Sequence, residues 1–157
     1  MVDTQNAKEE LVFKSCLLLV LHIKDLITHE KRTGKRIGYH SRIFQHFLHP
    51  EKKFVLLGES RKINENKDSD HHPEHIVPCA YMIKELERLL KEEKYSDECL
   101  ARALQKHWKI VHITREEAKR LDTDLKLKDK MPDGWDFMEI CSEKKKKKAR
   151  IEIVPVD

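Results

Sequence analysis

The stretch DSDHHPEHIVPC, residues 68–79, joins a polar loop to an apolar segment that is predicted to form a strand. Three histidines and three acidic residues lie between Asp68 and His75, and Ile-Val-Pro follows at once. Asp, Ser, Asn and His are common in loops because their side chains hydrogen-bond to nearby backbone. That explanation suits HHPEHIVP less well, because groups that carry protons or bind metals here directly precede a predicted strand at 74–78.

Length and composition indicate one folded domain. The chain has 157 residues, a natural size for a single core, and 39% of them are hydrophobic, which argues against wholesale disorder. The formal net charge of +4 is unevenly spread, with basic runs at 30–36 and 143–150. Basic runs attract phosphate backbones, although lysine-rich tracts are also common as solvated tails. We predict a globular domain over 1–142 and a basic tail over 143–157 that contains a candidate edge strand.

Hydrophobic periodicity predicts mostly helical structure with short strands. The stretch 5–29 has the pattern of one long amphipathic helix, which the two glycines of RTGKRIG end. The expected elements are helices at 5–29, 39–49, 80–93, 96–106 and 114–122, strands at 52–60, 74–78, 108–113 and 151–154, a polar loop at 61–72 and an aromatic anchor at 131–137. The expected fold class is α+β, a mostly helical single domain with a small antiparallel sheet.

The cysteines and the N-terminus argue against a cysteine-based zinc motif, a signal peptide and a membrane span. Cys16, Cys79, Cys99 and Cys141 are scattered without a CxxC pair, which disfavours a zinc ribbon or a four-cysteine finger. The chain starts polar and acidic, unlike a signal peptide, and its apolar run at 16–21 is too short to span a bilayer. We therefore expect a soluble, cytoplasmic protein that does not contact membranes.

Glu74 and His75 place a carboxylate beside an imidazole at the start of a predicted strand. Phosphodiester hydrolysis needs a base for the attacking water and positive charge at the phosphate. Histidine suits the first task because its ordinary pKa lies near neutrality, and carboxylate oxygen suits a Mg²⁺ ion. Neighbouring strand residues point to opposite faces, but a turn at the start of the strand could direct both toward one phosphate.

The segment PEHIVP, residues 73–78, resembles the signature of the HNH and related His-Me finger endonucleases. The resemblance continues more loosely in KIVHITREEAKRLD at 109–122, which is similar to the second strand and the helix of that finger. It implies a ββα-metal-like finger over about 73–122, with His75 as general base and Glu74 as a ligand of metal or water. It also implies Mg²⁺ or Mn²⁺ as cofactor and products with 5′-phosphate and 3′-hydroxyl ends. DNA is favoured over RNA as substrate, and the sequence leaves that choice open. The size suits a protein of a phage or mobile element, by analogy.

The chain departs from the family pattern in three ways. One is a long insertion, about thirty residues of predicted helix between the two halves of the finger. Trp108 and Lys109 stand where many HNH enzymes have an asparagine, and Ala118 stands where the resemblance implies a metal-binding histidine. A substitute ligand is therefore needed if a metal is bound.

Glu117 and His112 are the candidate substitutes beside Glu74. For Glu117 the alternative role is a capping box with Thr114 at the start of a helix. His112 alternates with the apolar residues of its predicted strand, so it is either exposed or directed into the site.

Other ligands and partners stay open. His71 or His72 with His75 and a distant ligand could hold a structural Zn²⁺ instead, although adjacent histidines in a polar loop are more often exposed. The candidate nucleic-acid-binding residues are Arg61, Lys62, Arg115, Lys144, Lys145 and Lys146. A non-catalytic nucleic-acid-binding or protein-interaction module built on a degenerate finger is the alternative function. The helix at 5–29 is apolar on several sides and could also form a homodimer.

Overall fold

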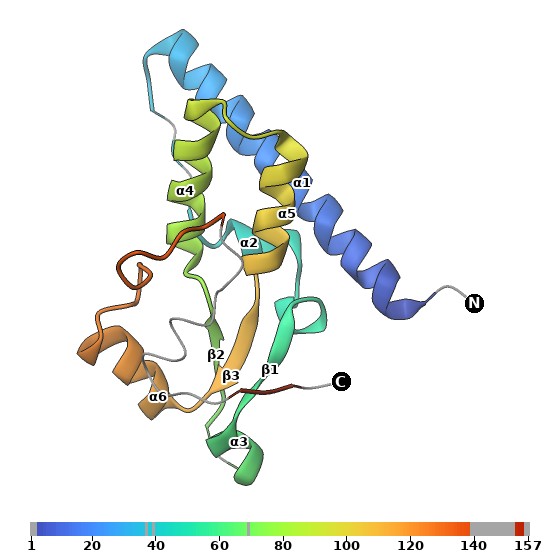
Figure 1. The fold of residues 1–157 in the computed structure, drawn as a ribbon, viewed down its shortest axis with the longest axis vertical. Helices are drawn as coiled ribbons and strands as arrows, with labels where there is room; N and C mark the ends of the chain where they lie inside the picture. Colours follow the sequence, from blue (N-terminus) through green and yellow to red (C-terminus); the bar gives the residue numbers. More distant parts are fainter. Residues whose placement is uncertain (1–2, 37, 39, 69, 139–152, 156–157) are drawn as a thin grey trace.

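The computed structural model describes residues 3–36, 38, 40–68, 70–138 and 153–155. Figure 1 shows helices packed at one end of a small sheet. The helices are α1 (Thr4–Thr33), α2 (Ile43–Phe47), the 3₁₀ helix η1 (Glu51–Lys53), α3 (Arg61–Glu65), α4 (Cys79–Glu92), α5 (Asp97–His107), α6 (Arg115–Lys119) and the π-helical segment η2 (Arg120–Asp124). The strands are β1 (Leu56–Ser60), β2 (His72–His75), β3 (Ile110–Ile113) and β4 (Ile153–Pro155).

The sheet has the order β2-β3-β1-β4 and is mixed. β1 is parallel to β3, while β2 and β4 run antiparallel to their neighbours. The predicted α+β class is therefore confirmed, but the prediction of an antiparallel sheet was wrong for the pair β1 and β3, which is parallel. The predicted pairing of the strands near His75 and Ile113 is also confirmed, because His75 lies opposite Ile110 and His72 opposite Ile113. α6 follows β3 directly and contacts β2, as expected.

The long helix α1 packs against α4 and α5 to form the main core. The Asp3 side chain caps its start by accepting from the Gln5 backbone N–H, and Gly34 ends it in the left-handed region at φ 68°. The core-facing stripe includes Leu19 and Ile23, both nearly inaccessible to solvent. Within the described residues, no helix is both long enough and apolar enough to cross a membrane.

The capping signals place two further helices as predicted. The Ser96 hydroxyl accepts from the Cys99 backbone N–H at the start of α5. The Thr114 hydroxyl accepts from the Glu117 N–H, while the Glu117 carboxylate accepts from the Thr114 N–H, which completes the predicted capping box of α6.

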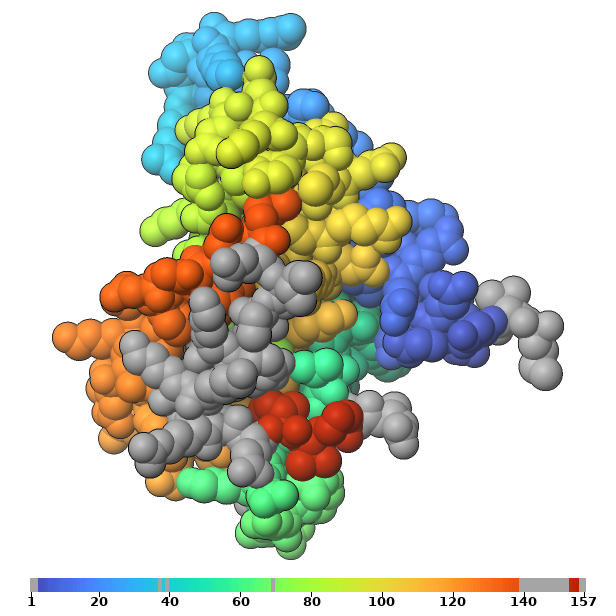
Figure 2. Space-filling model, in the orientation of Figure 1, coloured from blue at the N-terminus to red at the C-terminus, as the bar shows by residue number. Residues whose placement is uncertain are grey.

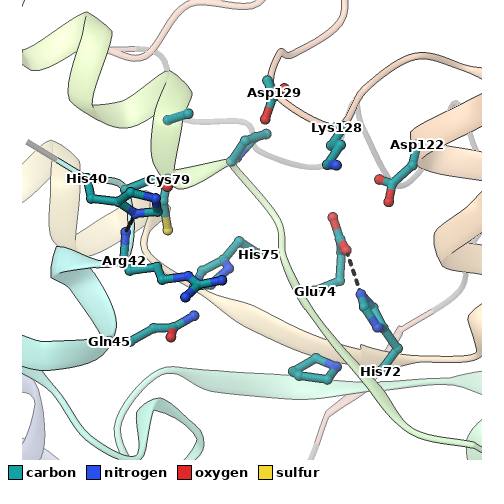
Figure 3. Close-up of a pocket in the computed structure, with 14 residues that line it drawn as sticks. His40, Arg42, Gln45, His72, Glu74, His75, Cys79, Asp122, Lys128 and Asp129 are labelled. Carbon is teal, nitrogen blue, oxygen red and sulfur yellow. Dashed lines mark hydrogen bonds and ion pairs between the residues drawn. The ribbon is translucent and has the colours of Figure 1, made fainter.

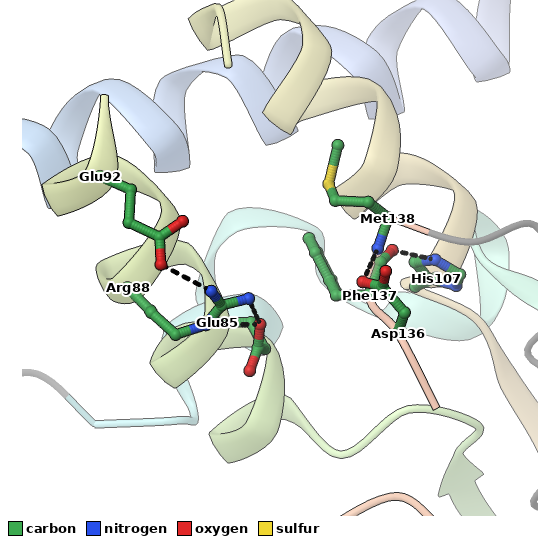
Figure 4. A network of polar contacts seen from close by, with 7 residues as sticks. All are labelled: Glu85, Arg88, Glu92, His107, Asp136, Phe137 and Met138. Atoms are coloured by element: carbon green, nitrogen blue, oxygen red, sulfur yellow. Dashed lines mark hydrogen bonds and ion pairs between the residues drawn. The ribbon is translucent and has the colours of Figure 1, made fainter. Parts of the chain in front are cut away.

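The aromatic anchor after η2 is confirmed, because Trp135 and Phe137 are buried. Nε2 of His107, at the end of α5, lies 2.7 Å from the Phe137 carbonyl oxygen (Figure 4). The same view shows Arg88 on the surface of α4, bonded to carboxylates one turn away on either side. The anchor thus ties the segment after η2 to the helical layer.

Two element boundaries were predicted wrongly before β2. The strand expected at 52–60 starts only at Leu56, because the N–H groups of Phe54 and Val55 bond to the Glu51 carbonyl and hold a turn there. The polar loop expected at 61–72 contains α3, which Ser60 caps and which buries Ile63.

The other strands are shorter or shifted. The strand expected at 74–78 is β2 at His72–His75, and the buried residues after it lead into Pro78, the N-cap of α4. Within the expected strands at 108–113 and 151–154, β3 begins at Ile110 and β4 at Ile153. Ile151 lies outside the described residues. The helix expected at 39–49 is confined to Ile43–Phe47.

Candidate functional site

Glu51, His75 and Trp108 form one hydrogen-bonded set. The Oε2 atom of Glu51 accepts from Trp108 Nε1 at 2.8 Å and lies 2.7 Å from His75 Nε2. Trp108 is fully buried and Glu51 is 9% exposed, whereas the His75 side chain keeps 21% of its surface exposed. The imidazole is therefore the member of the set most accessible to solvent.

Three separate elements position this set. Glu51 begins η1, His75 ends β2, and Trp108 is the C-cap of α5, two residues before β3 begins. The Trp108 ring packs edge-on against Phe44, with ring centroids 5.0 Å apart. Because the Ile76 N–H also bonds to the Lys109 carbonyl, the residues after His75 stay paired to the chain after Trp108. The imidazole is thus held by the sheet and by the core together.

The charge of Glu51 fixes the tautomer of His75. Burial raises the pKa of the Glu51 carboxyl, but the hydrogen bond and charge of His75 and the hydrogen bond from Trp108 outweigh burial and bring the pKa below its ordinary value. Glu51 is therefore ionised at neutral pH and can only accept hydrogen bonds. A neutral His75 must then carry its proton on Nε2, so Nδ1 is the ring nitrogen that has the lone pair.

A cavity of about 440 Å³ opens beside His75. Glu51, Lys52 and His112 contribute to its wall. The pKa of His112 lies below its ordinary value, first because of burial and then because of the charge of His71, so His112 is neutral at pH 7. Lys52 brings a positive charge to the wall of the same cavity.

Glu74 lies on the other face of β2. Figure 3 shows Glu74 and His75 on opposite sides of the strand. Glu74 Oε2 is 3.4 Å from His72 Nε2, and both residues line a second cavity of about 480 Å³ together with Asp122 and Asp129. Arg42 and Lys128 line the same cavity, so its wall carries charges of both signs.

The two cavities adjoin at β2, the outer strand of the sheet. His75, Pro73 and Gln45 line both of them. A ligand that crosses the edge of the sheet here would meet the imidazole on one side and carboxylates on the other.

The three predicted metal ligands do not come together. Glu74 and His112 belong to opposite faces of the β2–β3 pair, and Glu117 is buried in its capping box with Thr114. Within the described residues, no three His, Cys, Asp or Glu side chains are grouped so that they could hold a metal ion. The arrangement therefore does not fit the predicted Mg²⁺ or Mn²⁺ site.

His71, His72 and His75 are close in the sequence, but their side chains contact different partners in the structure. The His71 ring packs edge-on against the His112 ring, with centroids 5.5 Å apart. His72 contacts Glu74, and His75 contacts Glu51. The histidines of the alternative zinc site thus have different neighbours and do not share one centre.

Three of the predicted phosphate-binding residues lie together, namely Arg61, Lys62 and Arg115. Lys62 is 4.0 Å from Glu116, and Arg115 is 3.4 Å from Asp70. All three follow the ends of β1 and β3, which are at the end of the sheet opposite to His75. The remaining three, Lys144, Lys145 and Lys146, lie outside the described residues.

Glu51 and Trp108 are the functional candidates that sequence reasoning missed. They are 57 residues apart, and Glu51 is 24 residues from His75, so no local pattern connects them. The one available signal is weak: Glu51 lies three residues before the apolar segment that starts at Phe54, and a carboxylate that becomes buried needs donors.

Comparisons with known proteins give no match, whether with family models, with curated proteins or with solved structures. A functional conclusion therefore depends on the chemistry of the site itself. Its strongest element is the buried carboxylate that orients a solvent-accessible imidazole.

Proposed function

We propose that the protein is an endonuclease that hydrolyses phosphodiester bonds in DNA, with His75 as the general base. The observation that carries the proposal is the 2.7 Å contact between His75 Nε2 and the ionised, buried Glu51. A base held by a second group through its other nitrogen is the arrangement that proton transfer requires. The resemblance of PEHIVP to the HNH and His-Me finger signature supports the same residue as base.

In the proposed reaction, Nδ1 of His75 takes a proton from a water molecule in the 440 Å³ cavity. The water oxygen bonds to phosphorus, the bond from phosphorus to the leaving sugar oxygen breaks, and the leaving oxygen takes a proton from solvent. The imidazolium then returns its proton to solvent, which restores the neutral base. The Glu51 carboxylate stabilises the imidazolium while it exists. The ammonium group of Lys52 stabilises the negative charge that develops on the phosphoryl oxygens.

A requirement for Mg²⁺ or Mn²⁺ comes from the resemblance and stays a prediction. A divalent ion would supply further positive charge at the phosphate. Because Glu74, His112 and Glu117 do not converge, no step of the proposed reaction is assigned to an ion.

A non-catalytic nucleic-acid-binding module is the second candidate. The observation that favours it is the separation of Glu74 from His112 across the sheet. A chain that lost its metal site could keep the oriented histidine as part of its core.

Plasmid cleavage by the full chain tests the first proposal. The wild type should convert supercoiled plasmid to nicked or linear product, and parallel samples with Mg²⁺, Mn²⁺ or EDTA measure the metal requirement. His75→Ala should lower the rate by about 10²–10⁴-fold, the usual contribution of a general base. His72→Ala is the matched control on the other face of β2 and should change the rate little.

Folding has to be checked separately, because His75 is also a partner of Glu51. Circular dichroism melts of both variants identify any loss of folded protein at the assay temperature. Tight binding of DNA without cleavage in Mg²⁺, Mn²⁺, Ni²⁺, Zn²⁺ or EDTA would reject the endonuclease and favour the binding module.

A further inference from the structure

We propose that a basic groove next to the His75 cavity binds the phosphate backbone of duplex DNA and guides it to His75. The basic groove is defined by five side chains, Lys8, Lys52, Arg102, Lys106 and Lys109. The choice of DNA as the polyanion rests on the proposed function. The groove consists of two neighbouring cavities on the side of the molecule where α1 lies next to β1 and α5.

The groove has two sections that share a wall. The first, of about 390 Å³, lies between the early turns of α1 and β1, and Lys8, Lys52 and Lys109 line it. The second, of about 500 Å³, lies between α1 and the later turns of α5, and Arg102, Lys106 and Lys109 line it. Lys109 contributes to both sections, so they are neighbours.

Lys52 connects the groove to the candidate site. It lines the first section and also the cavity that contains His75. It follows Glu51 in η1, so its backbone is fixed by the same turn that holds the orienting carboxylate. Figure 2 shows the dark-blue start of α1 near the residues of β1 and the red strand β4. Pro155 of β4 is one of the residues that line the first section.

The side chains of the groove give it excess positive charge. Five basic residues face two acidic ones, Glu9 and Glu10. Glu10 is 3.0 Å from Lys14, and Glu9 accepts a hydrogen bond from the Gln5 side chain, so both acids have partners. Burial lowers the pKa of Lys109, and a phosphate beside it would favour its charged form.

The lining favours a duplex over a single strand. Proteins that bind single strands without sequence preference stack bases on exposed aromatic rings. In this groove the Arg102 guanidinium covers the Phe13 ring, 4.0 Å from its centroid, and Phe54 packs against the core. Phosphate contacts without such stacking are typical of binding to a duplex backbone.

Binding of a fluorescent duplex oligonucleotide to the full chain in EDTA, measured by anisotropy over a series of salt concentrations, tests the groove. Lys8→Gln/Lys106→Gln removes two charges from the two sections. Lys84→Gln/Lys91→Gln removes two charges from α4, outside the groove, and is the matched control. The groove variant should bind more weakly, and the slope of log affinity against log salt should fall by about 1.8, or about 0.9 per phosphate contact.

An unchanged slope in the groove variant, or an equal loss in the control, would overturn the proposal. Tighter binding of a single strand than of the duplex would also overturn it. Single-turnover cleavage over a range of protein concentrations separates the groove from the site. The Lys8→Gln/Lys106→Gln variant should need more protein for half-maximal cleavage, whereas the Lys84→Gln/Lys91→Gln control should match the wild type. Groove-dependent binding by a wild type that never cuts would reject the hydrolysis and support the groove alone.

Discussion

The two faces of β2 give neighbouring residues opposite surroundings. On one face, His75 contacts a buried carboxylate that also accepts from the Trp108 indole. On the other, Glu74 contacts His72, whose side chain is 43% exposed, at the wall of an open cavity. In the sequence Glu74 and His75 look like one catalytic pair. The strand separates them, and the partner that orients His75 comes from a distant turn instead.

This difference has an energetic consequence. A hydrogen bond to a buried charge contributes more than an exposed ion pair, which solvent and salt weaken. Substitutions on the Glu51 side should therefore cost stability, whereas those on the Glu74 side should cost little.

The largest expected change in stability is at Glu51. Glu51→Ala should lower the free energy of unfolding by about 2–4 kcal/mol, because charge-assisted hydrogen bonds contribute about 1.5–3 kcal/mol and a buried donor left without a partner costs about 1–3 kcal/mol. The donor left behind is the fully buried Trp108 indole. Urea unfolding of the variant and the wild type measures the difference.

Glu74→Ala is the matched control and should cost less than Glu51→Ala, because the His72 partner of Glu74 is 43% exposed and solvent weakens their ion pair. If Glu51→Ala does not fold, Glu51→Gln keeps the shape of the side chain and removes only its charge. Equal losses of unfolding free energy in the Glu51 and Glu74 variants would contradict the proposed difference between the two faces of β2.

Much of the fold could be predicted because its signals are local. The capping residues Ser96 and Thr114 and the glycine after α1 mark helix ends directly in the sequence. The start of β1 could not be predicted, because Phe54 and Val55 have strand-like side chains while their N–H groups bond to the Glu51 carbonyl. There a turn hydrogen bond overrides side-chain preference.

The candidate site was predictable only in part. His75 stands out by its neighbours in the chain, and the structure gives it a carboxylate partner. That partner, Glu51, is brought to it by tertiary packing and not by spacing in the sequence. Strand pairing separates the predicted ligand His112 from Glu74, because pairing with β2 directs His112 to the face opposite Glu74. Tertiary structure thus adds Glu51 to the site and separates two of its predicted members.

The next expected effect is a dependence of stability on pH that requires Glu51. Its pKa in the folded protein lies below its ordinary value, so its contribution is fully present above the unfolded pKa, about 4.3 for glutamate, and is lost as the pH falls through the folded pKa. The difference in unfolding free energy between the wild type and Glu51→Gln should therefore shrink from pH 6 toward acid. Urea titrations at several pH values measure it, and a constant difference would contradict the ionised Glu51.

The smallest expected effect is at His72. Its contact with Glu74 is 3.4 Å long and the His72 side chain is 43% exposed, so His72→Ala should change the free energy of unfolding by less than about 1 kcal/mol. Because salt screens exposed charges, even this loss should disappear in about 1 M NaCl, where the screening length is about 3 Å. The loss caused by His75→Ala should persist in the same salt, since burial protects its bond to Glu51 from screening. Urea unfolding of both variants at low and high salt thus compares the two faces directly, and a salt-sensitive loss at His75 would place Glu51 in solvent rather than in the core.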